Sequence, residues 1–287
     1  MGALLRLALP KGRQQDEVLR LLEDAGIRVT SGGRAYRPTV SLPDVEAKLL
    51  KPQNVVEMLA AGARDVGFAG ADWTEEKDVP LVELLDTGLN PVRIVAAAPR
   101  ELLDHNGELP RRPLVIASEY AEITRRWIER TGLDATVLRT YGATEVFPPE
   151  DADLIVDNTS TGSTLRANGL VILDEVARSS TRLYASRAAA DDPGKRARLD
   201  ELVLLLQSVL DARSRVMLEL NVSAEDLDGV LDVLPCMRQP TISDLRGDAG
   251  FAVRAAVPRA AIAELVPRLK ELGGADIVIS RVDQIVS

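Results

Sequence analysis

The residues whose types and spacing best suit chemistry lie between Asp153 and Leu170. An apolar run, Leu154 to Val156, predicts a buried strand, and a helical stretch follows a turn rich in serine and threonine. Free N–H groups at a helix start attract a dianionic phosphate, and Gly162 permits close approach of the backbone. Asp157, at the strand end, could accept hydrogen bonds from sugar hydroxyls. Hydroxyl donors are supplied by Thr161, Ser163 and Thr164.

This segment has two readings when it is taken alone. It could hold a phosphorylated sugar, or it could be an ordinary serine- and threonine-rich turn that only caps a helix. Spacing does not separate the two, because both need the same residue types.

Several charged side chains elsewhere also stand where anions could bind. Lys11 and Arg13 follow an N-terminal strand, Lys51 precedes a helix, and Arg93 starts a strand. Asp72 ends the turn after Gly67 and could contact a nucleotide or cap a helix. For the four cations the alternative is a solvated surface charge.

The composition excludes several classes of function. A net charge of −9 and an isoelectric point near 4.9 disfavour binding to nucleic acid or to anionic membranes. The single cysteine, Cys236, excludes an internal disulfide, and the single histidine, His105, is predicted to lie in a loop near Gly107. We expect no signal peptide and no membrane span, and therefore a cytoplasmic protein.

Alternating strands and helices predict an α/β fold with two lobes and a cleft between them. Short strands are expected at 4–9, 65–70, 92–97, 113–117, 137–138, 154–156, 170–173 and 182–186. A helix should begin at Pro52, and Ser118 with Glu119 should cap a helix that carries Trp127. Trp73 and Trp127 are expected in the core. The first lobe would comprise residues 1–91 and 181–212, and the second residues 92–180.

The remainder, residues 213–287, is predicted to be a separate module. Strands at 216–222, 241–245, 251–257 and 277–279 alternate with two amphipathic helices, near 227–234 and 262–272. The order β-α-β-β-α-β is that of a ferredoxin-like domain. Such an order suggests regulation or assembly but defines no function.

Four stretches together resemble the ATP phosphoribosyltransferase family, in its long, allosterically regulated form. They are Leu7 to Arg13, Asp65 to Asp72, Glu145 to Leu170 and the C-terminal module. The match spans nearly the whole chain and implies a two-lobed unit like that of periplasmic binding proteins. Two departures are visible: the stretch from Glu145 to Asp153 is one residue shorter than usual, and Asn158 stands where an aliphatic residue is typical.

The resemblance implies that the adenine ring of ATP attacks the anomeric carbon of phosphoribosyl pyrophosphate, with Mg²⁺ on the diphosphate. It implies histidine as a feedback inhibitor and a homo-oligomer, a dimer that can become a hexamer. The phosphoribosyl pyrophosphate site would use Asp157, Thr159, Ser160, Thr161, Gly162, Ser163 and Thr164. The nucleotide or its phosphates would meet Lys11, Arg13, Lys51, Asp72 and Arg93. The histidine site would comprise Asn221, Met237, Thr241 and Asp276.

Two other functions remain open at this point. Two lobes around a cleft also describe solute-binding proteins, although these carry a signal peptide and lack such a C-terminal module. An amino-acid sensor that uses only the last module is the second alternative, but it leaves the turn at 157–165 without a purpose.

Overall fold

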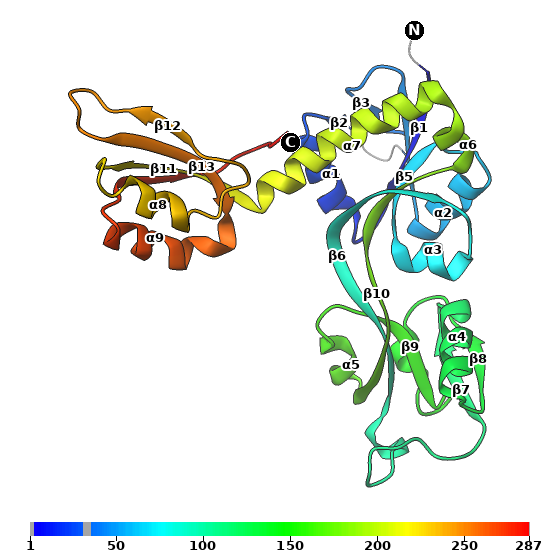
Figure 1. Cartoon of the computed structure of the whole chain (residues 1–287). Helices are drawn as coiled ribbons and strands as arrows, with labels where there is room; N and C mark the ends of the chain where they lie inside the picture. The colour runs from blue at the N-terminus through cyan, green and yellow to red at the C-terminus, as the bar shows by residue number, and fades with distance from the viewer. Residues whose placement is uncertain (1–2, 31–35, 287) are drawn as a thin grey trace. The chain divides into compact units, whose positions relative to one another are not determined.

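The computed structural model describes residues 3–30 and 36–286 and divides into two compact units (Figure 1). The first unit comprises Met1–Arg20 and Ile27–Asp200, and the second comprises Leu21–Gly26 and Glu201–Ser287. No helix of the described ranges is both long and apolar enough to cross a membrane.

The first part of the larger unit is a parallel sheet whose two inner strands are almost fully buried, whereas its edge strand alternates between buried and more exposed residues. Strand β1 pairs with β4 on one side and with β5 on the other. Helix α2 begins at Pro52, as predicted, and buries Val55, Val56 and Leu59. The elements here are β1 (Leu5–Pro10), α1 (Gln15–Asp24), β2 (Val29–Thr30), β3 (Thr39–Val40), β4 (Val45–Leu50), α2 (Pro52–Ala60), β5 (Val66–Gly70) and α3 (Ala71–Lys77).

Two long antiparallel strands, β6 (Val82–Pro99) and β10 (Leu170–Ala185), run through both lobes of this unit (Figure 1). The prediction of separate short strands at 170–173 and 182–186 was wrong, because one strand of 16 residues covers them. The polar residues between them stay in the β6–β10 ladder through several register shifts. Their hydrogen bonds to the neighbouring strand, rather than burial, hold this middle section, so the hydrophobic pattern did not reveal it.

The second lobe continues the same sheet beyond β6. The sheet order is β4-β1-β5-β10-β6-β9-β7-β8, with β9 antiparallel to β6 and parallel to β7. Trp73 and Trp127 are both buried in one apolar cluster, as predicted. The elements are β7 (Leu114–Ser118), α4 (Ala121–Thr131), β8 (Ala135–Arg139), β9 (Leu154–Thr159) and α5 (Ser163–Ala167), with short 3₁₀ turns at Arg100–Leu102 and Thr144–Val146. Helix α6 (Arg187–Asp191) follows β10 back in the first lobe (Figure 1), where the N–H of Ser186 donates to the carbonyl of Asp65.

The start of α4 is capped differently from the prediction. Tyr120 is the N-cap residue and gives no side-chain cap. The carboxylate of Glu76, on α3, accepts from the backbone N–H groups of Glu122 at 2.9 Å and Ile123 at 3.1 Å. A residue more than forty positions away therefore replaces the expected local cap, and it joins the two lobes through α3 and α4.

The second unit has the predicted β-α-β-β-α-β order after a long helix. Its four strands are antiparallel, in the order β12-β13-β11-β14, and α8 and α9 bury their apolar faces against the sheet. This confirms an α/β catalytic fold with a ferredoxin-like module. The elements are α7 (Pro193–Arg213), β11 (Arg215–Val222), α8 (Leu227–Val233), β12 (Thr241–Asp244), β13 (Phe251–Pro258), a 3₁₀ turn (Arg259–Ala261), α9 (Ile262–Glu271) and β14 (Ala275–Ser280).

Candidate functional site

The turn between β9 and α5 has a backbone fixed by its own hydrogen bonds. Gly162 precedes the helix with φ of 72°, a left-handed conformation that favours glycine. Its N–H donates to the Thr159 hydroxyl at 2.9 Å, and the hydroxyls of Thr161 and Ser163 lie 3.0 Å apart. The first N–H groups of α5 have no partner within the helix, so the turn can offer donors to an anion.

This turn lines a cavity of about 290 Å³. Arg13, from the loop after β1, lies on its wall and adds a cation to a site otherwise made of hydroxyls and backbone. Glu145 and Asp157 supply the two carboxylates. The turn residues on the wall are Asp157, Asn158, Thr159, Ser160, Thr161, Ser163, Thr164 and Leu165.

The carboxyl group of Asp157, at the end of β9, has a raised pKa. Burial raises the pKa of its carboxyl group to about 6, and the nearby charges of Glu119 and Glu145 act in the same direction. A hydrogen bond from the backbone N–H of Asn158, 2.7 Å away, opposes the rise. The carboxylate is ionised at neutral pH but poised near its transition, as groups at binding sites often are.

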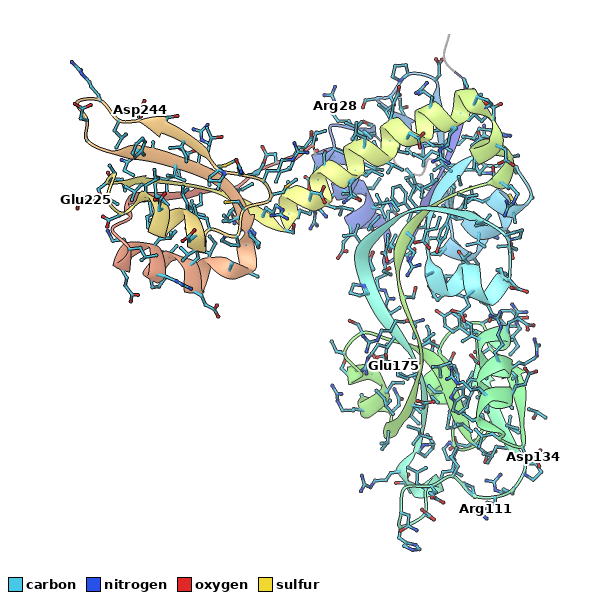
Figure 2. All side chains as sticks on the ribbon, viewed as in Figure 1. Arg28, Arg111, Asp134, Glu175, Glu225 and Asp244 are labelled. Atoms are coloured by element: carbon cyan, nitrogen blue, oxygen red, sulfur yellow. The ribbon has the colours of Figure 1, made fainter. Side chains whose placement is uncertain are left out.

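The other predicted cations lie outside this cavity. The Lys11 ammonium stands 4.1 Å from the centre of the Tyr36 ring. Arg93 lies on β6 beside Thr159, and its guanidinium is 3.4 Å from the carboxylate of Glu175, which Figure 2 labels on the crossing strand. Lys51 is the N-cap residue of α2 and is exposed.

Asp72 is buried at the start of α3, with 7% of its surface exposed. Its carboxylate accepts from the Ser179 hydroxyl at 2.6 Å and from the Tyr120 hydroxyl at 2.8 Å. Sequence reasoning missed both partners, since Ser179 is 107 residues away and Tyr120 is 48 residues away. Asp72 was singled out by its place at the end of the turn after Gly67, but no local pattern pointed to Tyr120 or Ser179.

The C-terminal unit has its own cavity, of about 390 Å³, on the face of its sheet. Asn221, Thr241 and Asp276 line it together, and the Asn221 amide donates to Asp276 at 3.0 Å. Met237 is not among the residues that line it. Its backbone N–H instead donates to the carbonyl of Ala256 at 3.3 Å, just before the edge strand β12.

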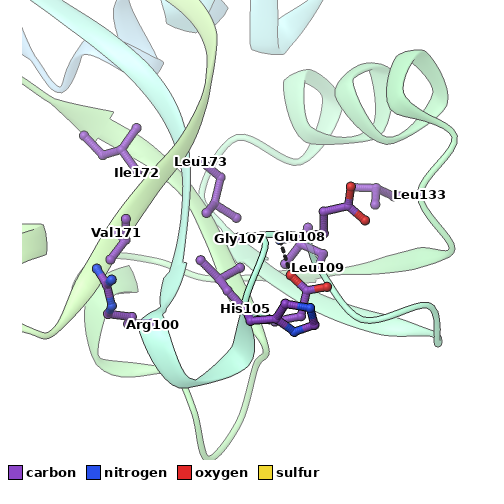
Figure 3. A pocket seen from close by; sticks show the side chains of 11 residues that line it. Arg100, His105, Gly107, Glu108, Leu109, Leu133, Val171, Ile172 and Leu173 are labelled. Atoms are coloured by element: carbon purple, nitrogen blue, oxygen red, sulfur yellow. Dashed lines mark hydrogen bonds between the residues drawn. The ribbon is translucent and has the colours of Figure 1, made fainter.

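A cavity of about 830 Å³ lies in the second lobe, beside the 3₁₀ turn at Arg100–Leu102 (Figure 3). His105 stands there in a turn, as predicted, among Arg100, Glu108 and leucine side chains.

In the part of the chain that the structure describes, no group of three or more His, Cys, Asp or Glu side chains is placed to hold a metal ion. The cavity beside the turn offers hydroxyls, N–H groups and one arginine, which suit the oxygens of a phosphate. These donors fit a metal ion that arrives on a diphosphate better than one that resides in the protein.

A two-lobed α/β unit with a serine- and threonine-rich turn on a polar cavity, joined to a ferredoxin-like module, is the architecture expected of a regulated phosphoribosyltransferase. Residues 51–208 match the family described as ATP phosphoribosyltransferase (HisG), and residues 212–284 match the HisG C-terminal domain. The chain belongs to the ATP phosphoribosyltransferase family.

Individual relatives are similar over nearly their whole length. An ATP phosphoribosyltransferase of Solibacter usitatus is 37% identical over 293 residues, which cover 99% of each chain. One of Desulforudis audaxviator is 38% identical over 284 residues, or 96% of each chain. Among solved structures, the ATP phosphoribosyl transferase (HisG:HisZ) complex of Thermotoga maritima matches with a TM-score of 0.64 and 29% identity, covering 72% of this chain and 99% of that one.

Proposed function

We propose that this chain transfers the phosphoribosyl group of phosphoribosyl pyrophosphate to the adenine ring of ATP, the first step of histidine biosynthesis. The observation that carries the proposal is the Thr159–Leu165 turn facing Arg13 across one cavity, in a chain of this family. The turn would hold the 5′-phosphate, and Asp157 would accept from the ribose hydroxyls. Thr159, Ser160, Thr161, Gly162, Ser163 and Thr164 complete this half of the site.

The reaction exchanges one bond at the anomeric carbon for another. A ring nitrogen of adenine supplies the electron pair of the new C–N bond, and the pair of the broken C–O bond leaves with pyrophosphate. A neutral nitrogen nucleophile needs little proton transfer, so alignment and charge stabilisation should supply most of the acceleration. Arg13 stands where the leaving diphosphate would be neutralised, with Lys11, Lys51, Asp72 and Arg93 proposed for the nucleotide side.

Mg²⁺ is proposed as the cofactor, carried by the oxygens of the diphosphate. It would supply charge neutralisation at the leaving group. The chain's contribution is to bind the organic part of the same substrate through Arg13 and the turn. We assign no protein ligand to the ion.

Regulation is proposed for the C-terminal module. The cavity lined by Asn221, Thr241 and Asp276 would bind histidine, with the Asp276 carboxylate facing its amino group. Met237 would contribute from just outside the cavity wall. We also propose a homo-oligomer, dimer to hexamer, that works in the cytoplasm, with the three-domain division 1–91 and 181–212, 92–180, and 213–287.

The test mixes the purified full chain with ATP, phosphoribosyl pyrophosphate and Mg²⁺ and follows the adduct by absorbance. Inorganic pyrophosphatase is added to draw the equilibrium forward. Adduct formation that requires both substrates supports the proposal. Absence of adduct at every protein concentration, with a known enzyme of this activity working in the same buffer, would refute it.

A further inference from the structure

A chain of hydrogen bonds links the two lobes of the catalytic unit through buried side chains. It runs from Ser179 on the crossing strand β10 to Asp72 on α3, then to Tyr120 at the start of α4, and ends at Asn158 on β9. The Tyr120 hydroxyl lies 2.8 Å from Asp72 and 2.9 Å from the Asn158 side-chain nitrogen. Tyr120 has 1% of its surface exposed, so water does not replace these partners.

The direction of each bond follows from the chemistry of the groups. The hydroxyl of Tyr120 donates to the Asp72 carboxylate. Burial and the charge of Asp72 raise the pKa of Tyr120, so the phenol keeps that proton. The phenol oxygen must therefore accept from its other neighbour, and the Asn158 amide nitrogen is the donor there.

The same amide nitrogen also lies near Asp157, which lines the cavity beside the turn. It lies 3.4 Å from Oδ1 of Asp157, and the backbone N–H of Asn158 donates to that oxygen at 2.7 Å. Both neighbours of the amide are acceptors, which fixes the amide with its nitrogen toward them. Asn158 thus contacts both Asp157, on the wall of the turn's cavity, and Tyr120, which in turn binds Asp72.

An aliphatic side chain at this position could fill the same space but could not donate. It would leave the Tyr120 oxygen with an unfilled acceptor site in a buried place. It would also remove the side-chain donor of residue 158 from Asp157, which the Asn158 backbone N–H and the Thr144 side chain still contact. The packing role of residue 158 and its hydrogen-bonding role can therefore be separated by substitution.

We propose that Asn158 is a positioning residue for phosphoribosyl transfer, which orients Asp157 relative to Tyr120 of the same lobe and, through Tyr120, to Asp72 of the other lobe. The proposal rests on the proposed function and deepens it. Asn158 itself takes no part in bond exchange. Its amide fixes the Asp157 carboxylate, which would contact the ribose, relative to Tyr120 and Asp72.

The experiment is a double-mutant cycle on the full chain with Asn158→Leu, Tyr120→Phe and the pair of substitutions, in the adduct assay. We expect Asn158→Leu to lower kcat/KM for phosphoribosyl pyrophosphate about tenfold, the size of one lost buried hydrogen bond. In the Tyr120→Phe background the same substitution should cost threefold or less, because its acceptor is already gone. KM is the informative constant, since loss of folded protein alone lowers activity without changing it.

Asn168→Leu is the matched control. Asn168 follows α5 in the same region, is exposed and donates only to the Thr164 carbonyl at 3.0 Å. It should change kcat/KM less than twofold. Asn158→Asp keeps the size but replaces the donor with an acceptor, and it should be worse than Asn158→Leu; it serves the cycle if the leucine variant does not fold.

Equal effects of Asn158→Leu in both backgrounds, or an unchanged KM in the wild-type background, would overturn the positioning role. Those results would leave the proposed function intact, because they require an active wild-type chain. An inactive wild-type chain would instead refute the proposed function.

Discussion

The turn at 157–165 and the cavity of the C-terminal module are two polar sites built in opposite ways. The turn lies where buried strand β9 meets a helix, and its glycine and hydroxyl groups are fixed by bonds within seven residues. The C-terminal cavity lies on an open sheet face and takes side chains from four strands. Its Asn221–Asp276 bond joins two surface-accessible groups.

The difference shows which kind of site depends on backbone geometry. A turn that binds through N–H groups tolerates no added side chain, whereas a site of strand side chains can be retuned one residue at a time. The first should therefore fail completely when its backbone changes, and the second should change its affinity by degrees.

The largest effect is expected from Gly162→Val. A Cβ at this position would lie 3.1 Å from the Arg166 guanidinium, and φ of 72° is strained for a branched residue. Displacement of the anion-binding N–H groups should lower kcat/KM for phosphoribosyl pyrophosphate at least 10²-fold, the size of losing a preorganised donor. Steady-state kinetics in the adduct assay measures it.

Gly132→Val is the control for strain alone. Gly132 ends α4 with φ of 69°, and a Cβ there meets nothing within 4 Å. Both variants should lose similar stability, but Gly132→Val should keep its kcat/KM within about threefold. Equal loss of activity in the two variants would mean that strain, not the anion site, explains the result.

Asp157→Asn should lower activity but, above the pKa of Asp157, raise stability. It removes the carboxylate that accepts from the ribose, and we expect a loss of about 10²-fold in kcat/KM, comparable to a lost charge-assisted contact. In the wild type the pKa of about 6 predicts that kcat/KM falls as pH drops below 6, and the asparagine variant should lack this dependence.

The stability of the same variant follows from the raised pKa of Asp157 in the folded chain. The folded pKa of Asp157 is raised, so its favourable contribution is complete below the unfolded value and is lost as pH rises through about 6. At pH 7.5 the variant without substrate should be more stable by about 1–2 kcal/mol. Thermal denaturation of both proteins tests this, and a less stable variant would contradict it.

A third comparison contrasts ion pairs in the two units. The Asp65 side chain, 3% exposed, binds Arg6 at 3.1 Å and Lys195 at 2.7 Å. Asp65→Asn should lower the free energy of unfolding by about 3 kcal/mol, because two cations lose a buried partner. Glu219→Gln, which breaks the exposed pair with Arg254 in the C-terminal unit, should cost below about 1 kcal/mol.

The pH dependence of the Asp65 contribution has a definite sign. Burial acts to raise the pKa of Asp65, but the bonds from Arg6 and Lys195 outweigh it and lower the pKa. The stabilisation is therefore present above the unfolded value of about 3.9 and is lost as pH falls through the lower folded value. Urea denaturation from pH 7 to pH 3 should show the gap between wild type and Asp65→Asn closing below about pH 4.

The smallest effect is expected in the C-terminal cavity. Asp276→Asn should weaken inhibition by histidine about tenfold, the size of one charge-assisted hydrogen bond, and should leave uninhibited kcat/KM within twofold. Asp244→Asn, on β12 at the opposite edge of the same sheet and outside the cavity, is the control (Figure 2). Equal inhibition of all three proteins by histidine would remove Asp276 from the site.

Much of this fold could be predicted because many of its elements are short apolar or amphipathic runs between clear turn signals. The start of helix α2 at Pro52 and the β-α-β-β-α-β order of the C-terminal module are examples. The long strands β6 and β10 could not be predicted, since their middle sections are polar and are held by pairing with each other. The cap of α4 by Glu76 was equally hidden, because it depends on a contact between distant helices.

In the candidate site, too, local sequence features could be predicted and contacts between distant residues could not. The turn at 157–165 was visible because its chemistry is contiguous in the sequence. Arg13 at the same cavity was predicted, but neither Glu145 nor the Tyr120–Asn158 bond was, since tertiary packing alone brings them together. Asn158 stood out only as a departure from an aliphatic residue, and the structure supplies the partner that gives this departure a physical meaning.

The central claim is that the turn after β9 binds the phosphoribosyl group. Calorimetric titration of phosphoribosyl pyrophosphate with Mg²⁺ into the wild type and into the Thr161→Val, Gly162→Val double variant tests it most directly. We expect saturable binding to the wild type and none to the variant, with both proteins showing the same far-ultraviolet circular dichroism. Unchanged affinity in a folded variant would contradict it.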